Sequence, residues 1–373
     1  MIIKRLNLIL ATTCLLLPAG MLLHAASGTE GAAFLDIPTG AGPAAMGGAY
    51  SALAKNAYAP TWNPAGLGFL DSTQLAGQHL SYLDSIQYEY LSFVHPLDHS
   101  TSCSTANLCP GSALGGSIQY LGSGDINGMS NSGDPTGTFS SHYAAYNLAY
   151  GRAFTDKLSL GATGKLINAK IDDVSANAYA MDLGSMYRMQ DNLMLAATLT
   201  NIGTQLKFLS DGDPLPLAFH VGGAYQATHQ LLISAEGVYP RTGLASFHVG
   251  SEWRPMEMLA LRMGYKTDTL KGLSPLAGFT LGLGLDVWGQ ELSYAWAPMG
   301  ELGNTNYISL IVRFGEAEKS KRNLIYYQTI KKQRTVKRSS DKDKTDDDYQ
   351  QLMQLFSVDN SHLAQSDFHT EDR

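Results

Sequence analysis

Long apolar runs are missing from this chain after its first 23 residues. No later stretch reaches the roughly 18 apolar residues that a membrane-spanning helix needs. Charge is also scarce, because residues 1–315 carry 37 of the 59 charged side chains, about 12% of positions against an average near 25%. That part of the chain offers no basic patch, so we expect no binding of nucleic acid.

Cysteines are few, and the motifs of common enzymes are absent. Cys103 and Cys109 form a close pair in a polar stretch, which favours a local disulfide in an oxidising compartment. No histidine or further cysteine nearby completes a zinc site. The His-Glu-x-x-His spacing is absent, and no glycine motif marks a nucleophile. We therefore expect a protein that is not an enzyme and that needs no metal or cofactor.

The N-terminus has the order of a secretory signal peptide. A basic start at Met1–Arg5 precedes an apolar run from Leu6 to Leu23, and small residues at 25–27 offer a cleavage site. A membrane anchor is the alternative, but the bend at Pro18–Gly20 interrupts the run. We predict a signal peptide over residues 1–26.

The C-terminal region differs from the rest of the chain. All 38 glycines and all 14 prolines lie before Glu316, whereas residues 316–373 carry 22 charged side chains, 11 of each sign. Such charge runs are usually solvated. We expect a partly disordered periplasmic tail over 316–373, with a periplasmic docking arm as the alternative.

Between these ends, apolar residues alternate with small or polar ones. In Phe279–Val287, Phe, Leu, Leu, Leu and Val share one face, and Thr, Gly, Gly and Asp share the other. Such alternation over about ten residues is typical of membrane β-barrel strands, which touch lipid on one face only. A soluble β-sandwich is the alternative. The number of segments favours the barrel, since fourteen occur near residues 74–82, 87–96, 113–123, 142–153, 158–170, 178–189, 192–202, 217–227, 230–240, 245–254, 258–267, 277–288, 290–299 and 306–315.

The connections between these segments alternate in length. Short links alternate with longer polar ones, such as 126–141 and 203–216, as expected of periplasmic turns and external loops. An even strand number places both ends of the barrel in the periplasm. Aromatic residues near segment ends predict girdles at the membrane surface, and they are Tyr88, Tyr90, Tyr120, Tyr146, Tyr150, Tyr239, Trp253, Tyr294 and Trp296.

Charged residues recur on the inward faces of four neighbouring segments. Opposite charges on adjacent strands can pair. They form either a network that holds the N-terminal segment or a polar lining that a ligand passes. His220 and His248 are expected on the same face. The predicted network consists of Glu236, Glu252, Arg254, Arg262, Lys266 and Asp286.

Residues 27–72 are apolar and rich in small residues, yet too interrupted for a long helix. Gly47-Gly48 permits close approach of the backbone, and Asn63-Pro64 predicts a turn before the first strand. Such a segment needs burial without regular strands. The lumen of a barrel can supply that burial.

The same segment resembles a known family. The residues that carry the likeness are Phe34-Leu35 with Gly40, Ala45-Met46-Gly47-Gly48-Ala49-Tyr50 and Asn63-Pro64-Ala65-Gly66-Leu67. They resemble the PorV/PorQ family of outer-membrane proteins, which is related to FadL-type fatty-acid transporters. The likeness continues through Tyr88–Leu91 and Leu121–Asp125 to Tyr307–Gly315, and it covers about residues 29–315.

This resemblance implies a 14-stranded barrel with an N-terminal hatch in its lumen. The hatch motif comprises Met46, Gly47, Gly48, Ala49, Tyr50, Asn63, Pro64, Ala65 and Gly66. Family members serve type IX protein secretion, as shuttles for exported proteins, or the passage of hydrophobic molecules. Ala54-Lys55-Asn56-Ala57 stands where an acidic pair is common, so an acidic contact of the hatch is in doubt. The long tail is an addition to the family pattern.

The sequence therefore predicts an all-β fold, a 14-stranded antiparallel transmembrane β-barrel over 73–315 with a lumen hatch over 27–72 and a polar C-terminal tail. We expect it in the outer membrane, in contact with lipid, with both termini periplasmic. The resemblance favours a component of type IX-like protein secretion that holds or shuttles exported proteins, with secreted proteins or other secretion components as its partners. A FadL-like transporter of a hydrophobic ligand is the alternative.

Overall fold

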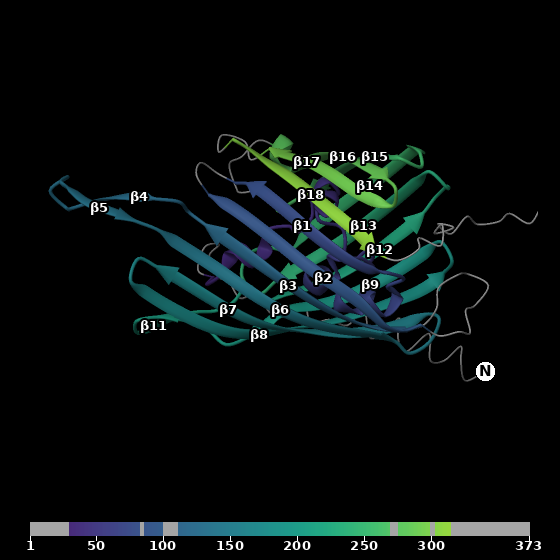
Figure 1. The fold of residues 1–373 in the computed structure, drawn as a ribbon, viewed down its shortest axis with the longest axis horizontal. Helices are drawn as coiled ribbons and strands as arrows, with labels where there is room; N and C mark the ends of the chain where they lie inside the picture. The colour runs from purple at the N-terminus through teal and green to yellow at the C-terminus, as the bar shows by residue number, and fades with distance from the viewer. Residues whose placement is uncertain (1–29, 83–85, 100–110, 269–274, 299–302, 315–373) are drawn as a thin grey trace, which may run out of the picture. The chain divides into compact units, whose positions relative to one another are not determined.

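The computed structural model describes residues 30–82, 86–99, 111–268, 275–298 and 303–314. Fourteen strands form one closed antiparallel barrel (Figure 1), and each corresponds to one predicted segment. They are β1 (Thr73–Ser81), β2 (Gln87–His99), β3 (Gly111–Gly122), β6 (Ser141–Ala153), β7 (Leu158–Ile171), β8 (Val174–Gln190), β9 (Leu193–Gly203), β12 (Ala218–Gln226), β13 (Leu231–Pro240), β14 (Ser246–Met256), β15 (Leu259–Lys266), β16 (Phe279–Val287), β17 (Gln290–Pro298) and β18 (Asn304–Phe314).

The first and last strands close the ring. β1 pairs with β18 from Thr73 opposite Phe314 to Ser81 opposite Asn306. Every barrel strand therefore has two hydrogen-bonded neighbours, and the sheet has no free edge. The predicted 14-stranded closed barrel is confirmed.

Two small hairpins lie in connections that the sequence predicts only as loops. One is β4 (Ile126–Met129) with β5 (Pro135–Phe139), and the other is β10 (Leu206–Phe208) with β11 (Asp211–Asp213). Their strands are only three to five residues long, too short for the alternation to be recognised in the sequence. The β4–β5 hairpin projects well beyond the barrel (Figure 1). Both belong to the end with the longer connections, which we call the long-connection end. The opposite end is the short-turn end.

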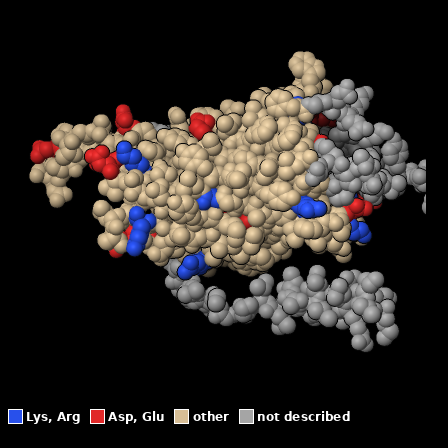
Figure 2. Space-filling view, turned by 60° about the horizontal axis from the view of Figure 1, so that its bottom comes forward, with Lys and Arg blue, Asp and Glu red and all other residues tan. Residues whose placement is uncertain are grey.

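The outer surface of the barrel is apolar. Leu281, Leu283 and Leu285 of β16 are each at least 40% exposed. Figure 2 shows a face on which charged side chains are sparse and gather mainly toward the ends. Among the described residues, no helix is long and apolar enough to cross a membrane.

The predicted aromatic girdle needs a correction. Most of its members do lie outward, with Tyr120, Tyr146 and Trp253 more than 40% exposed. Tyr88 and Tyr90 instead point into the lumen and are buried, at 0% and 2% exposure. Their hydroxyl groups explain this, because one accepts a hydrogen bond from Gln119 Nε2 and the other donates to Ala57 O.

The N-terminal segment fills the lumen with four short helices (Figure 1). They are η1 (Ala33–Asp36), α2 (Ala41–Ala45), α3 (Ala59–Trp62) and η2 (Pro64–Phe69), and a further short helix, η3 (Pro275–Gly278), precedes β16. Proline and glycine keep the hatch helices short. The buried core therefore lies inside the barrel, where Phe34, Tyr58 and Leu67 of the hatch pack with Leu80 and Val94 of the wall. The predicted signal peptide, the pair Cys103 and Cys109, and the tail lie outside the described residues.

Candidate functional site

One side of the hatch lies directly against β14–β16. A Cβ added to Gly264 would lie 2.1 Å from Gly47 N, and one added to Gly250 would lie 2.6 Å from Met46 O. Gly47 itself has φ +65°, a left-handed conformation that favours glycine. The motif residues Met46 and Gly47 therefore touch the wall where inward-facing glycines leave room.

The other side of the hatch lies against β6–β8 in the same manner. Added Cβ atoms on Gly151 and Gly161 would lie 2.3 Å from Pro64 O and 2.4 Å from Pro64 C. On Gly184, an added Cβ would lie 2.2 Å from Asn63 Oδ1. The second half of the motif thus occupies a second set of glycine positions.

Asn63 links hatch and wall through its amide. Its Nδ2 donates to Ser51 O at 3.0 Å and to Ser185 O at 3.2 Å, while its Oδ1 accepts from Ala65 N at 3.1 Å. The side chain is fully buried. Every hydrogen-bonding atom of this amide has a partner, which is the usual condition for burying one.

Wall side chains also satisfy the irregular hatch backbone. Thr280 Oγ1 donates to Ala45 O at 2.9 Å, and Thr163 Oγ1 donates to Pro60 O at 2.9 Å. Glu236 Oε2 accepts from Ser51 N at 2.9 Å. Buried backbone groups need such partners. The hatch is therefore attached to the wall by specific hydrogen bonds.

The six predicted network residues fall into three groups. Glu252 pairs with Arg254 and, at 2.7 Å, with Arg262. Lys266 lies 3.5 Å from Asp268. Glu236 is separate and pairs with His220 at 3.0 Å. Asp286 belongs to the first group, because it lies 4.0 Å from Arg313, which Glu291 links to Arg262.

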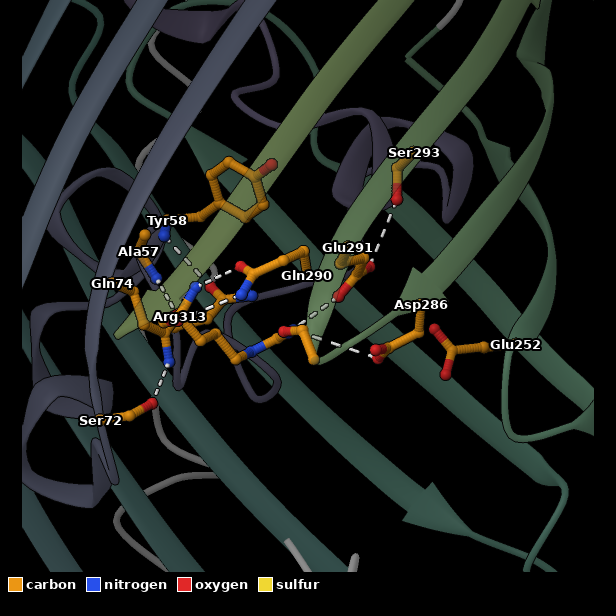
Figure 3. Close-up of polar contacts among 12 residues, drawn as sticks. Ala57, Tyr58, Ser72, Gln74, Glu252, Asp286, Gln290, Glu291, Ser293 and Arg313 are labelled. Carbon is orange, nitrogen blue, oxygen red and sulfur yellow. Dashed lines mark hydrogen bonds and ion pairs between the residues drawn. The ribbon is translucent and has the colours of Figure 1, made fainter. Parts of the chain in front are cut away.

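Residues that the prediction omits complete the first group. Glu291 of β17 joins Arg262 at 2.6 Å to Arg313 at 3.0 Å, and Figure 3 shows Glu291 beside Arg313. Arg262 also donates to Ser293 Oγ at 2.9 Å. The alternation with outward Leu292 could have revealed Glu291. This charged group spans β14–β18 and is paired throughout.

A second buried ion pair lies across the lumen wall on β7 and β8. Lys165 Nζ is 2.7 Å from Asp182 Oδ2, and both side chains are at most 4% exposed. Lys165 Nζ also donates to Asn201 Oδ1. The backbone nitrogen of Asn201 donates to Asp182 Oδ1. A register shift between β8 and β9 brings Asn201 there, which no sequence pattern predicts.

Half-buried apolar side chains gather inside the long-connection end. Phe34 of the hatch lies 5.7 Å from the ring of Tyr143, which pairs with Leu121 across β3 and β6. We call this group the mouth cluster, and its half-buried members are Leu35, Ile37, Tyr82, Leu121, Tyr143 and Phe208. Its exposed part offers an apolar surface formed by both the hatch and the wall. Among the described residues, no group of three or more side chains could hold a metal ion.

Comparison with solved structures finds the same barrel in transport proteins. The toluene transporter TodX of Pseudomonas putida has a TM-score of 0.51 at 16% identity, covering 73% of this chain and 96% of that one. The monoaromatic hydrocarbon channel CymD has a TM-score of 0.51 at 13% identity, covering 74% and 98%. No protein-family model matches the sequence, and no curated protein matches it. At these identities the similarity shows the fold.

Proposed function

We propose that this protein carries a hydrophobic solute across the bacterial outer membrane. The mouth cluster carries this proposal, because apolar side chains of the hatch and the wall remain half-exposed at the long-connection end. Ligand sites are typically concave and mostly apolar. The shared fold with a toluene transporter and a hydrocarbon channel supports transport better than secretion.

The apolar outer surface supports an outer-membrane location. In the orientation usual for such barrels, the long connections face outward and the short turns face the periplasm. β18 then ends on the periplasmic side. Gly31, whose nitrogen donates to Pro214 O at 2.9 Å, then lies toward the outside. The sequence predicts that both termini are periplasmic. We propose this position only for the C-terminal end of the barrel.

Polar substitutions in the mouth cluster test the transport proposal. We expect Leu121→Asn and Tyr143→Asn to slow the uptake of pyrene into vesicles containing the purified protein, because both change the apolar surface. Met129→Asn is the matched control, since Met129 is 66% exposed on the β4–β5 hairpin at the same end. Equal uptake by all variants, or by vesicles without protein, would refute transport through this mouth.

A secretion role is the second candidate function. The hatch motif resembles the PorV/PorQ family, and the projecting β4–β5 hairpin, with Met129 and Ile126 exposed, offers a surface for an exported protein. Recovery of secreted proteins on the tagged full chain, and their loss when residues 127–138 are removed, would favour this candidate.

A further inference from the structure

Arg188 of β8 is a buried cation with two unused donor atoms. The residue is 5% exposed, and its buried Nε and Nη2 atoms have no hydrogen-bond partner among the described residues. Its guanidinium lies 5.3 Å from the centre of the Phe69 ring, which covers it from the hatch side. Leaving buried charged donors unpaired is costly. The position therefore suits an external partner.

Comparison with Arg262 shows how unusual this is. Arg262 is similarly buried, at 7% exposure, but its Nε, Nη1 and Nη2 atoms donate to Glu252, Ser293 and Glu291. Within the part of the chain that the structure describes, one buried arginine is thus paired completely, and two donor atoms of another have no acceptor. The unused atoms of Arg188, Nε and Nη2, lie on one edge of the guanidinium. That edge forms the two-donor fork that matches both oxygens of a carboxylate.

A second cation comes from the hatch. Lys55 follows Ala54, which presses against η2 so closely that a Cβ on Gly66 would lie 1.6 Å from Ala54 O. η2 also carries Phe69, the ring beside Arg188. Burial and the nearby Arg188 charge lower the pKa of Lys55. Ion pairs within 4 Å among the described residues include neither Lys55 nor Arg188.

The carboxylates that interact with these two cations do not form ion pairs with them. Asp156 and Asp191 interact electrostatically with Arg188, and Asp71 does so with Lys55. None of these pairs lies within the 4 Å of an ion pair. All three are exposed. Asp156 and Asp191 belong to short turns, and Arg188 N donates to Lys157 O in one of them, so the cations lie at the short-turn end. Apolar residues that include Leu53, Phe69, Met186 and Met194 form the adjoining cluster.

We propose that Arg188 and Lys55 form a binding site for a carboxylate at the short-turn end of the lumen. Arg188 supplies the two-donor fork, and Lys55 supplies a second positive charge. The carboxylate belongs either to an apolar acid, with its apolar part on the adjoining cluster, or to a small soluble acid. This site goes beyond the proposed function, because it requires binding but not transport.

Binding to the full chain in a nonionic detergent tests the site. The probes are sodium acetate, sodium decanoate and uncharged decanol, measured by calorimetry. We expect Arg188→Gln to weaken carboxylate binding about tenfold or more, since it removes hydrogen bonds to a charged group. Lys55→Gln should weaken binding by a smaller factor, and Arg188→Lys should lie between Arg188→Gln and the wild type. The binding of decanol should not change.

Arg152→Gln is the matched control. Arg152 lies near the same end of the barrel and 5.8 Å from the Phe154 ring, but it is exposed on the outer face. Arg188-dependent binding of either acid supports the site, and a preference for decanoate assigns it to apolar acids. The proposal is overturned if neither acid binds, or if Arg188→Gln binds both as the wild type does. Should Arg188→Gln fail to fold, Lys55→Gln and Arg188→Lys give the same test.

Discussion

A Cβ added to Gly264 on the inward face of β15 would lie 2.1 Å from Gly47 N, whereas one added to Gly164 on the outward face of β7 would meet nothing within 4 Å. Gly77, outward on β1, is equally open. Glycine therefore has two different roles in one wall. On the inward face glycine leaves room for the hatch backbone. On the outward face it only leaves open space at the outer surface. The hatch and the strands consequently constrain each other's sequence.

The largest effect is expected from filling an inward glycine position. Gly264→Val should destabilise the folded barrel by about 3 kcal/mol, because its Cβ meets the backbone of Gly47, which cannot move aside freely. The temperature at which the compact band on a denaturing gel shifts to the unfolded position measures this effect. Gly164→Val, facing outward, is the control. Similar temperatures for both variants would contradict the contrast between the two faces.

A smaller loss is expected from removing an inward charge of the wall. Arg262→Met should cost about 2 kcal/mol, because Glu252 and Glu291 lose the cation that they share. Denaturant unfolding of the folded barrel in detergent measures the loss. Lys266→Met is the control, since Lys266 pairs only with Asp268 at 3.5 Å among the described residues. Equal losses for the two variants would show that the shared pairing adds nothing.

The smallest effect is expected on the outward face. Gly77→Leu should change stability by less than about 0.5 kcal/mol, because its side chain enters an open groove of about 590 Å³ between Leu91 and Leu310. The same unfolding measurement applies. A loss comparable to that of Gly264→Val would mean that this part of the outer wall is packed as tightly as the lumen.

Much of this architecture can be predicted from the sequence. Period-two alternation gives all fourteen barrel strands, because lipid on one face demands apolar residues at every second position. It also places Arg262 and Glu252 in the lumen. The pairing of Arg262 with Glu291 depends on contacts across three strands, which alternation alone does not provide.

The predictions that failed did so where both faces of a strand are apolar. Tyr88 and Tyr90 alternate with Leu91 and Phe93, so the pattern cannot say which set faces lipid. The hatch makes the lumen apolar at this position and draws the tyrosines inward. Arg188 lies on the inward face of a recognisable strand, but its lack of partners depends on the fold of the hatch beside it.

The pairing of Thr73 with Phe314 has a consequence for assembly. The ring joins only when residues more than two hundred positions apart meet, and closing so long a loop costs entropy that shorter hairpins do not. The segment before Thr73 is enclosed by that same event. The hatch is therefore enclosed only once that pairing forms, and a chain cut before β18 would lack the strand that closes the ring around it.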